Sequence, residues 1–180
     1  TKKQKINKQY EQIIKNFNIY KGDFLQKINL KYIVLCKNLK VSEISALGFA
    51  NPEMKTLIFN INTDEKLLDR VLHHEVFHFI QHGNEDLFNR VNWEKLNDSN
   101  FKYQDCSTCT EKLGLNYSNS NNGFLTDYSM STPYEDMAEV YSFMITNKNL
   151  LIERSKKDAV IEKKIGFIKK YISKLENSIE

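Results

Sequence analysis

The chain has 180 residues and a formal net charge of +3, with 41% hydrophobic and 27% charged residues. This length fits one domain, and the apolar content is sufficient for a folded core, which excludes a disordered chain. Lysines are spread among Glu and Asp without a basic run, so we expect no nucleic-acid partner. Because no apolar stretch approaches the roughly 20 residues that span a bilayer, we expect no membrane insertion.

The first predicted element is an amphipathic helix over residues 5–17, where apolar residues recur at helical spacing. Runs rich in Ile, Val and Phe at residues 32–35 and 56–61 predict strands of one sheet. The chain begins at Thr1 and not at Met, which we interpret as a processed or trimmed product, so any targeting segment or lipid anchor lies outside this sequence. We expect a secreted or cell-surface setting for the function described below.

A second helix is predicted over residues 65–82, because residues 62–64 offer N-caps and Gly83 with Asn84 supplies a stop signal. This helix carries the metal motif described next. After it, residues 84–128 are polar and weakly periodic, apart from a possible short helix within residues 87–96. A loop of this length usually has a function.

The sequence His74-Glu75-Val76-Phe77-His78 predicts a zinc site. Residues four apart lie on one face of a helix, so His74 and His78 can direct their ring nitrogens at one ion. Glu75 is then placed beside the ion, where it can act as general base towards an attacking water.

Two further histidines flank this motif. His73 is rotated by about 100° from His74 around the helix, so we expect it to pack inside or lie at the surface. His82 lies on the ligand face one turn further on and stays a candidate for a role.

Three cysteines are too few for a disulfide scaffold. The pair Cys106 and Cys109 could share a metal or form a small bridge, but a structural zinc ion would need two more ligands. Only Cys36 and the motif histidines could supply those ligands, so we expect a loop that holds either free thiols or one local bridge.

Thr132 as N-cap and Pro133 at the first helical position predict a helix that continues to about residue 145. A last helix is predicted over residues 159–179. Its apolar stripe lies beside many lysines, so we expect this helix to pack on the domain and not to bind a membrane. The stripe consists of Ile161, Ile165, Ile168, Ile172 and Leu175.

Two glutamates in the helix after Thr132 are candidates for a third metal ligand, Glu135 and Glu139. A metzincin is excluded, because Asn84 occupies the position ten residues after His74 where that class carries a histidine. Thr132 to Glu135 also fits a capping box, in which Glu135 would turn back to its own helix N-terminus and leave Glu139 as the ligand.

With these residues the sequence resembles the gluzincin type of zinc peptidase. The segment from Tyr128 to Glu139 is similar to small bacterial zinc-binding metallopeptidases and to the catalytic domain of anthrax lethal factor, and the resemblance covers residues 57–145. It implies that Glu135 is the third ligand and that Glu139 orients a zinc-bound histidine. It also implies that Tyr128 donates a hydrogen bond to the oxyanion of the tetrahedral intermediate. Tyr134 is the alternative donor.

We therefore expect an α+β zincin-like fold that forms a single catalytic domain over residues 1–180. Residues 1–83 would form an N-terminal lobe with a mixed sheet and the motif helix, and residues 84–180 a C-terminal lobe with the third ligand. The segment 46–61 is the candidate floor or edge of the cleft, where such peptidases often bind substrate as an added strand. The loop 84–127 would line the opposite side.

The expected function is a zinc-dependent endopeptidase with one catalytic zinc ion, acting on an extended protein or peptide segment. The sequence assigns no oligomeric state. One alternative is a zinc-stabilised binding module without turnover, and another is a zinc hydrolase of a non-peptide substrate. Glu75 favours an enzyme, because a pure ligand set does not need an acid at that position.

Overall fold

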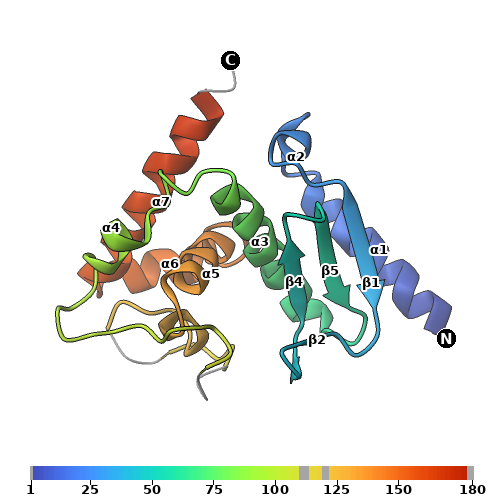
Figure 1. The fold of residues 1–180 in the computed structure, drawn as a ribbon, viewed down its shortest axis with the longest axis horizontal. Helices are drawn as coiled ribbons and strands as arrows, with labels where there is room; N and C mark the ends of the chain where they lie inside the picture. The colour runs from blue at the N-terminus through green and yellow to red at the C-terminus, as the bar shows by residue number, and fades with distance from the viewer. Residues whose placement is uncertain (1, 110–113, 119–121, 178–180) are drawn as a thin grey trace. The chain divides into compact units, whose positions relative to one another are not determined.

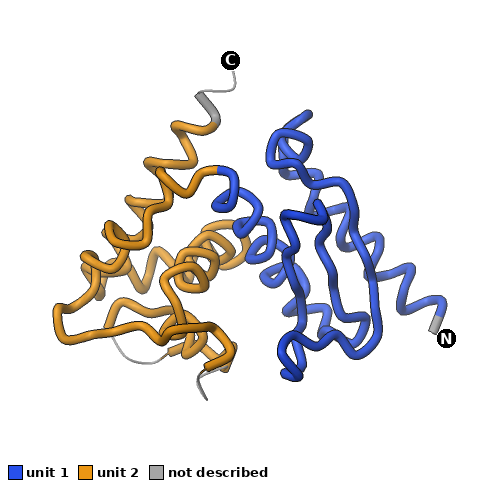
Figure 2. The backbone as a smooth tube through the Cα atoms, in the orientation of Figure 1, with its two compact units in different colours: residues 1–83 blue, residues 84–180 orange. Residues whose placement is uncertain are grey.

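The computed structural model describes residues 2–109, 114–118 and 122–177. Its helices and a small mixed sheet confirm the expected α+β class. The chain divides into two compact units, residues 1–83 and 84–180, which are coloured blue and orange in Figure 2. We describe each unit by itself.

The first unit contains the sheet and three helices, labelled in Figure 1. In chain order the elements are α1 (Lys2–Phe17), α2 (Phe24–Lys27), β1 (Tyr32–Cys36), β2 (Lys40–Val41), β3 (Ile44–Ser45), β4 (Gly48–Asn51), β5 (Thr56–Asn60) and α3 (Glu65–His82). The predicted helix over residues 5–17 and both predicted strands are therefore confirmed.

Strand β5 is the centre of the three-stranded sheet, which has the order β1-β5-β4. It runs parallel to β1 and antiparallel to β4, and its side chains Leu57 and Phe59 are fully buried. Strands β2 and β3 pair separately as a short antiparallel ladder. Strand β4 thus forms one edge of the sheet. It lies within the segment 46–61, which we expected to form the floor or edge of the cleft.

Helix α3 has the limits that the sequence predicts. The Asp64 side chain caps it by accepting a hydrogen bond from the backbone N–H of Lys66 at 2.8 Å, and the helix ends at His82 before Gly83. Helix α3 packs on strands β4 and β5 and on helix α1. Its buried apolar side chains are Leu68, Val71, Leu72, Val76, Phe77, Phe79 and Ile80.

Polar contacts fix helix α1 against helix α3. The side-chain amides of Gln12 and Asn16 both donate to the Asp69 carboxylate, at 2.6 and 2.7 Å. One turn further along α3, the two ring nitrogens of His73 lie 2.7 Å from the Tyr20 hydroxyl and 3.0 Å from the Asn16 side-chain oxygen. These contacts determine how α3 is rotated about its axis, and therefore which of its side chains point away from α1.

The regular secondary structure of the second unit is helical. Its elements are α4 (Arg90–Glu94), the 3₁₀ turn η1 (Tyr128–Met130), α5 (Pro133–Thr146), α6 (Lys148–Ser155) and α7 (Ala159–Asn177). Helix α5 begins at Pro133 with Thr132 as its N-cap, as predicted. Helix α6 was not predicted. Among the described residues, no helix combines the length and the apolar character needed to cross a membrane.

A buried ion pair between α5 and α7 lies at the centre of this unit. Lys164 Nζ lies 2.6 Å from Asp136 Oδ2, and both side chains are completely inaccessible to solvent. The same carboxylate oxygen accepts hydrogen bonds from Trp93 Nε1 at 2.8 Å and from the Tyr103 hydroxyl at 2.5 Å. Lys164 also donates to the backbone carbonyl of Gly123 at 2.7 Å. One of the lysines beside the apolar stripe of α7 is therefore a core residue.

Burial shifts the titration of this pair towards the neutral forms. It raises the pKa of Asp136 and lowers the pKa of Lys164, while the attraction between the two charges acts in the opposite direction for each. Burial together with the neighbouring Asp136 carboxylate also raises the pKa of Tyr103. Tyr103 is therefore a neutral hydroxyl donor over the ordinary pH range.

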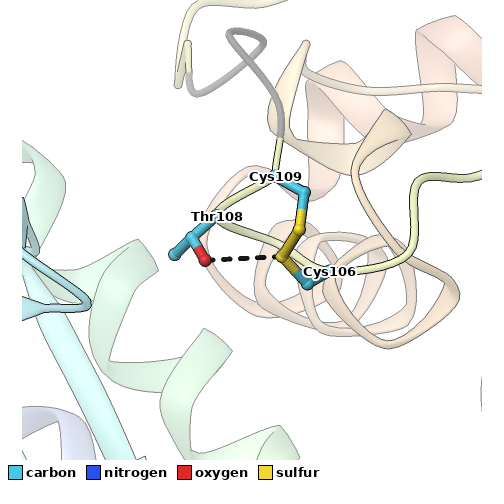
Figure 3. Close-up of a disulfide and its surroundings, with 3 residues drawn as sticks. All are labelled: Cys106, Thr108 and Cys109. Carbon is cyan, nitrogen blue, oxygen red and sulfur yellow. Dashed lines mark hydrogen bonds between the residues drawn. A yellow bond between two sulfur atoms is a disulfide. The ribbon is translucent and has the colours of Figure 1, made fainter.

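The loop before η1 contains a local disulfide between Cys106 and Cys109, with Cα atoms 5.2 Å apart (Figure 3). The Thr108 hydroxyl lies 3.5 Å from Cys106 Sγ. Of the two alternatives left open by the sequence, the structure thus contains the local bridge. Cys36 is a free thiol.

Replacing Lys164 by Met is expected to lower the free energy of unfolding by about 3–5 kcal/mol, because it leaves the Asp136 carboxylate buried without its cation. Urea denaturation measures the change. Lys163→Met is the matched control, since Lys163 is exposed at the preceding position of the same helix, and it should leave the midpoint nearly unchanged. Similar losses in the two variants would contradict a stabilising role for the pair.

Candidate metal centre

The motif helix brings the two histidine rings together. Nε2 of His74 and Nε2 of His78 lie 3.2 Å apart, and the rings meet edge to face with an interplanar angle of 77°. His74 is buried and His78 is half-buried. The i, i+4 spacing thus places two nitrogen donors at one point beside α3, as the sequence predicts.

This separation fits a shared zinc ion. Two nitrogens bound at 2.0–2.1 Å to one tetrahedral zinc ion are about 3.3 Å apart, close to the observed 3.2 Å. Neutral imidazole is also a preferred zinc ligand. The chemistry and the spacing of this donor pair therefore agree with a zinc site.

Glu75 follows the first histidine on α3 and is 8% exposed. Its side chain lies directly against the backbone of Gly48 in strand β4. A carboxylate that is nearly buried and adjacent to a donor pair is suited to proton transfer.

The other two histidines differ in their surroundings. His73 is 1% exposed, and burial lowers its pKa to about 4 against the opposing influence of Asp69. Its contacts with Tyr20 and Asn16 make it a packing residue, as expected. His82 lies in the last turn of α3 and is exposed.

In the second unit, Glu135 lies in the first turn of helix α5 and is half-buried. Its backbone N–H donates to the Thr132 hydroxyl at 3.3 Å, which is the N-cap interaction of this helix. Tyr134, the alternative oxyanion donor, is 44% exposed beside it.

Glu139 lies one turn after Glu135 and is 1% exposed. Its Oε2 atom accepts a hydrogen bond from the Thr126 hydroxyl at 2.8 Å. The same hydroxyl lies 3.1 Å from Ser129 Oγ and accepts from the Ser129 backbone N–H at 3.1 Å. This polar cluster connects helix α5 to the turn η1. Sequence reasoning missed Thr126 and Ser129, although their spacing of three residues is a side-chain turn signal.

Tyr128 is the first residue of η1 and is half-buried. Its backbone N–H donates to the carbonyl of Gly114 at 3.1 Å. Tyr128 therefore belongs to the segment that Thr126 and Ser129 fasten to Glu139. The structure places His74, Glu75 and His78 on one helix of the first unit, and Tyr128, Glu135 and Glu139 on neighbouring elements of the second.

Comparison with known proteins supports the chemistry of these residues. A family model described as "Putative zinc-binding metallo-peptidase" matches residues 3–177. No curated protein and no solved structure matches the chain.

Replacing Thr126 by Val keeps the shape of the side chain but removes the hydroxyl that donates to Glu139. Because Glu139 and Thr126 are both buried, we expect the free energy of unfolding to fall by about 1–3 kcal/mol. Thermal denaturation measures the loss. Thr146→Val is the control, since Thr146 is half-buried in the same unit and its hydroxyl contacts the end of its own helix, 2.8 Å from the Ser142 carbonyl and 2.8 Å from Asn147 Oδ1, so its loss should be smaller. A loss no larger than that of the control would contradict the importance of this bond.

Proposed function

The chain belongs to the family of zinc-binding metallo-peptidases whose family model matches residues 3–177, and from this premise we propose that it is a zinc-dependent endopeptidase. The observation that carries the proposal is the 3.2 Å separation of His74 Nε2 and His78 Nε2 with Glu75 between them on the same helix. Two nitrogen donors and an adjacent acid on one helix are an arrangement that supports metal-assisted hydrolysis of an amide.

We propose that His74 and His78 hold the ion together with Glu135. The two histidines come from the first unit and Glu135 from the second, and all three side chains are of types that bind zinc. Two histidines and one carboxylate are a ligand set of catalytic zinc, which leaves a position for water or substrate. When bound, zinc polarises the carbonyl under attack and makes water more acidic.

Glu75 is proposed as general base. Its carboxylate accepts a proton from the attacking water and later delivers that proton to the leaving amine. The position of Glu75, next to His74 and nearly buried, supports this role, because a general base must lie within hydrogen-bond reach of the water that it deprotonates. A binding module without turnover would not need an acid there.

Glu139 is proposed to orient a zinc-bound histidine and not to bind the metal itself. Its carboxylate already accepts the Thr126 hydroxyl and is almost completely buried, which suits a fixed hydrogen-bond acceptor. Glu135 is more accessible, and the group that it contributes to the capping interaction with Thr132 is its backbone N–H. In the alternative, Glu139 binds the metal and Glu135 caps its own helix.

Tyr128 is proposed to donate its hydroxyl proton in a hydrogen bond to the oxyanion that forms on the carbonyl. The polar cluster of Thr126 and Ser129 holds the turn that carries it. The proposed substrate is an extended protein or peptide segment, because strand β4 is an edge of the sheet and carries Gly48 against Glu75. Secretion or surface display is the proposed setting.

Replacing Glu75 by Gln should abolish peptide cleavage while zinc stays bound, because glutamine is isosteric but cannot take up the proton. We expect kcat to fall at least about 100-fold, as for removal of a general base. Cleavage of a diverse peptide library and metal analysis of the same samples measure both effects. Glu65→Gln, in the exposed first turn of the same helix, is the control and should be fully active.

The outcomes of this experiment separate the functional classes. Zinc in the native chain without cleavage of any peptide would favour a binding module or a non-peptide substrate. Absence of zinc from the native chain would contradict the proposal as a whole.

The variants Glu135→Gln and Glu139→Gln distinguish the two candidate ligands. Loss of a direct ligand should remove zinc under dialysis, whereas loss of an orienting carboxylate should weaken zinc binding by about 10- to 100-fold. We expect the first result for Glu135 and the second for Glu139. Zinc affinity is measured by competition with a chelator, and the reverse order would identify Glu139 as the ligand.

A further inference from the structure

Strand β4 passes unusually close to the side chain of Glu75 at Gly48. A Cβ atom added to Gly48 would lie 2.8 Å from Glu75 Cγ and 2.9 Å from Glu75 Oε1. It would also lie 2.8 Å from Val71 Cγ1. All three distances are shorter than side chains tolerate in proteins, so only glycine fits here without a displacement of its neighbours.

The strand cannot yield easily, because hydrogen bonds fasten the residues directly before Gly48. The backbone carbonyl of Leu47 accepts from the backbone N–H of Asn60 at 2.9 Å and from the Thr63 hydroxyl at 3.3 Å. The Asn60 side chain donates to the carbonyl of Ala46 at 3.2 Å. Asn60 and Thr63 are themselves buried, so these bonds do not exchange readily with water.

The helix cannot yield easily either. Helix α3 is buried along most of its length and is fixed to α1 through the contacts of Asp69 and His73. Val71 and Glu75 are four residues apart and face β4 from successive turns of α3. A side chain at position 48 would enter between these two turns, and the most mobile group that it meets is the Glu75 side chain.

We propose that Gly48 is a positioning residue for the general base: its missing side chain lets the backbone of β4 act as a wall that holds the Glu75 carboxylate in its working orientation. This inference rests on the proposed function of Glu75. Proton transfer requires the base within hydrogen-bond reach of the water, and a displacement of about 1 Å in such an arrangement can cost on the order of 100-fold in rate.

The variant Gly48→Ala tests the inference. We expect kcat to fall about 10- to 100-fold, with KM within about two-fold of the native value and one zinc ion still bound per chain. This combination separates a displaced base from general damage, which would change KM and zinc content as well. Gly166→Ala is the matched control, because a Cβ at Gly166 meets nothing within 4 Å and activity should be unchanged.

A thermal-denaturation cycle tests the contact without reference to activity. The native chain, Gly48→Ala, Glu75→Ala and the double variant are compared. Because removal of the Glu75 side chain removes two of the three close contacts, Gly48→Ala should lower Tm less in the Glu75→Ala background than in the native chain. Equal losses of Tm in the two backgrounds would overturn the inference.

The remaining outcomes are also decisive. A native value of kcat in Gly48→Ala would overturn the positioning role even if the cycle shows coupling. If Gly48→Ala does not fold, Val71→Ala is combined with it to relieve the third contact, and the loss of kcat relative to Val71→Ala alone should persist.

A native chain that holds zinc but cleaves no peptide would overturn the proposed function, and the role of Gly48 with it. An active native chain with an unaffected Gly48→Ala variant would overturn this inference alone.

Discussion

A buried polar side chain destabilises a protein unless a partner replaces the water that it loses, and both candidate site helices are arranged around this constraint. On α3, His73 meets it through Tyr20 and Asn16, which fixes the rotation of the helix. Glu75, also buried, lies against Gly48 of strand β4, and His74 meets His78 at 3.2 Å between their Nε2 atoms. Packing and function are therefore connected through the burial of one helix.

The same constraint operates in the second unit, although the partners there are charged. Asp136 directs one carboxylate oxygen at Lys164, Trp93 and Tyr103, and thereby fixes the first turn of α5 in the core. Glu135 precedes Asp136 and lies on a different face of the same turn. The half-exposed side chain of Glu135 is thus carried by a backbone with little freedom, which suits the role proposed for it.

Sequence reasoning succeeded where a local signal was sufficient. Asp64 marked the start of α3, Thr132 marked the start of α5, and the spacing of His74 and His78 predicted the close approach of their nitrogens. It failed where tertiary partners decide. The burial of Lys164 depends on Asp136, 28 residues earlier, so an amphipathic pattern treats it as one of many surface lysines. Strands β2 and β3 have two residues each, which is too short to show a periodic pattern. The close approach of Gly48 to Glu75 and Val71 depends on tertiary packing and has no signal in the sequence.

The disulfide between Cys106 and Cys109 closes a ring of only four residues. The stabilisation that a cross-link provides grows with the chain length that it encloses, and a ring of this size removes only about 2 kcal/mol of conformational entropy from the unfolded chain. Most of the stability must therefore come from the two cores, around Phe59 and Trp93, and not from oxidation. Reduction of the bridge would accordingly loosen the loop before η1 and leave both cores in place.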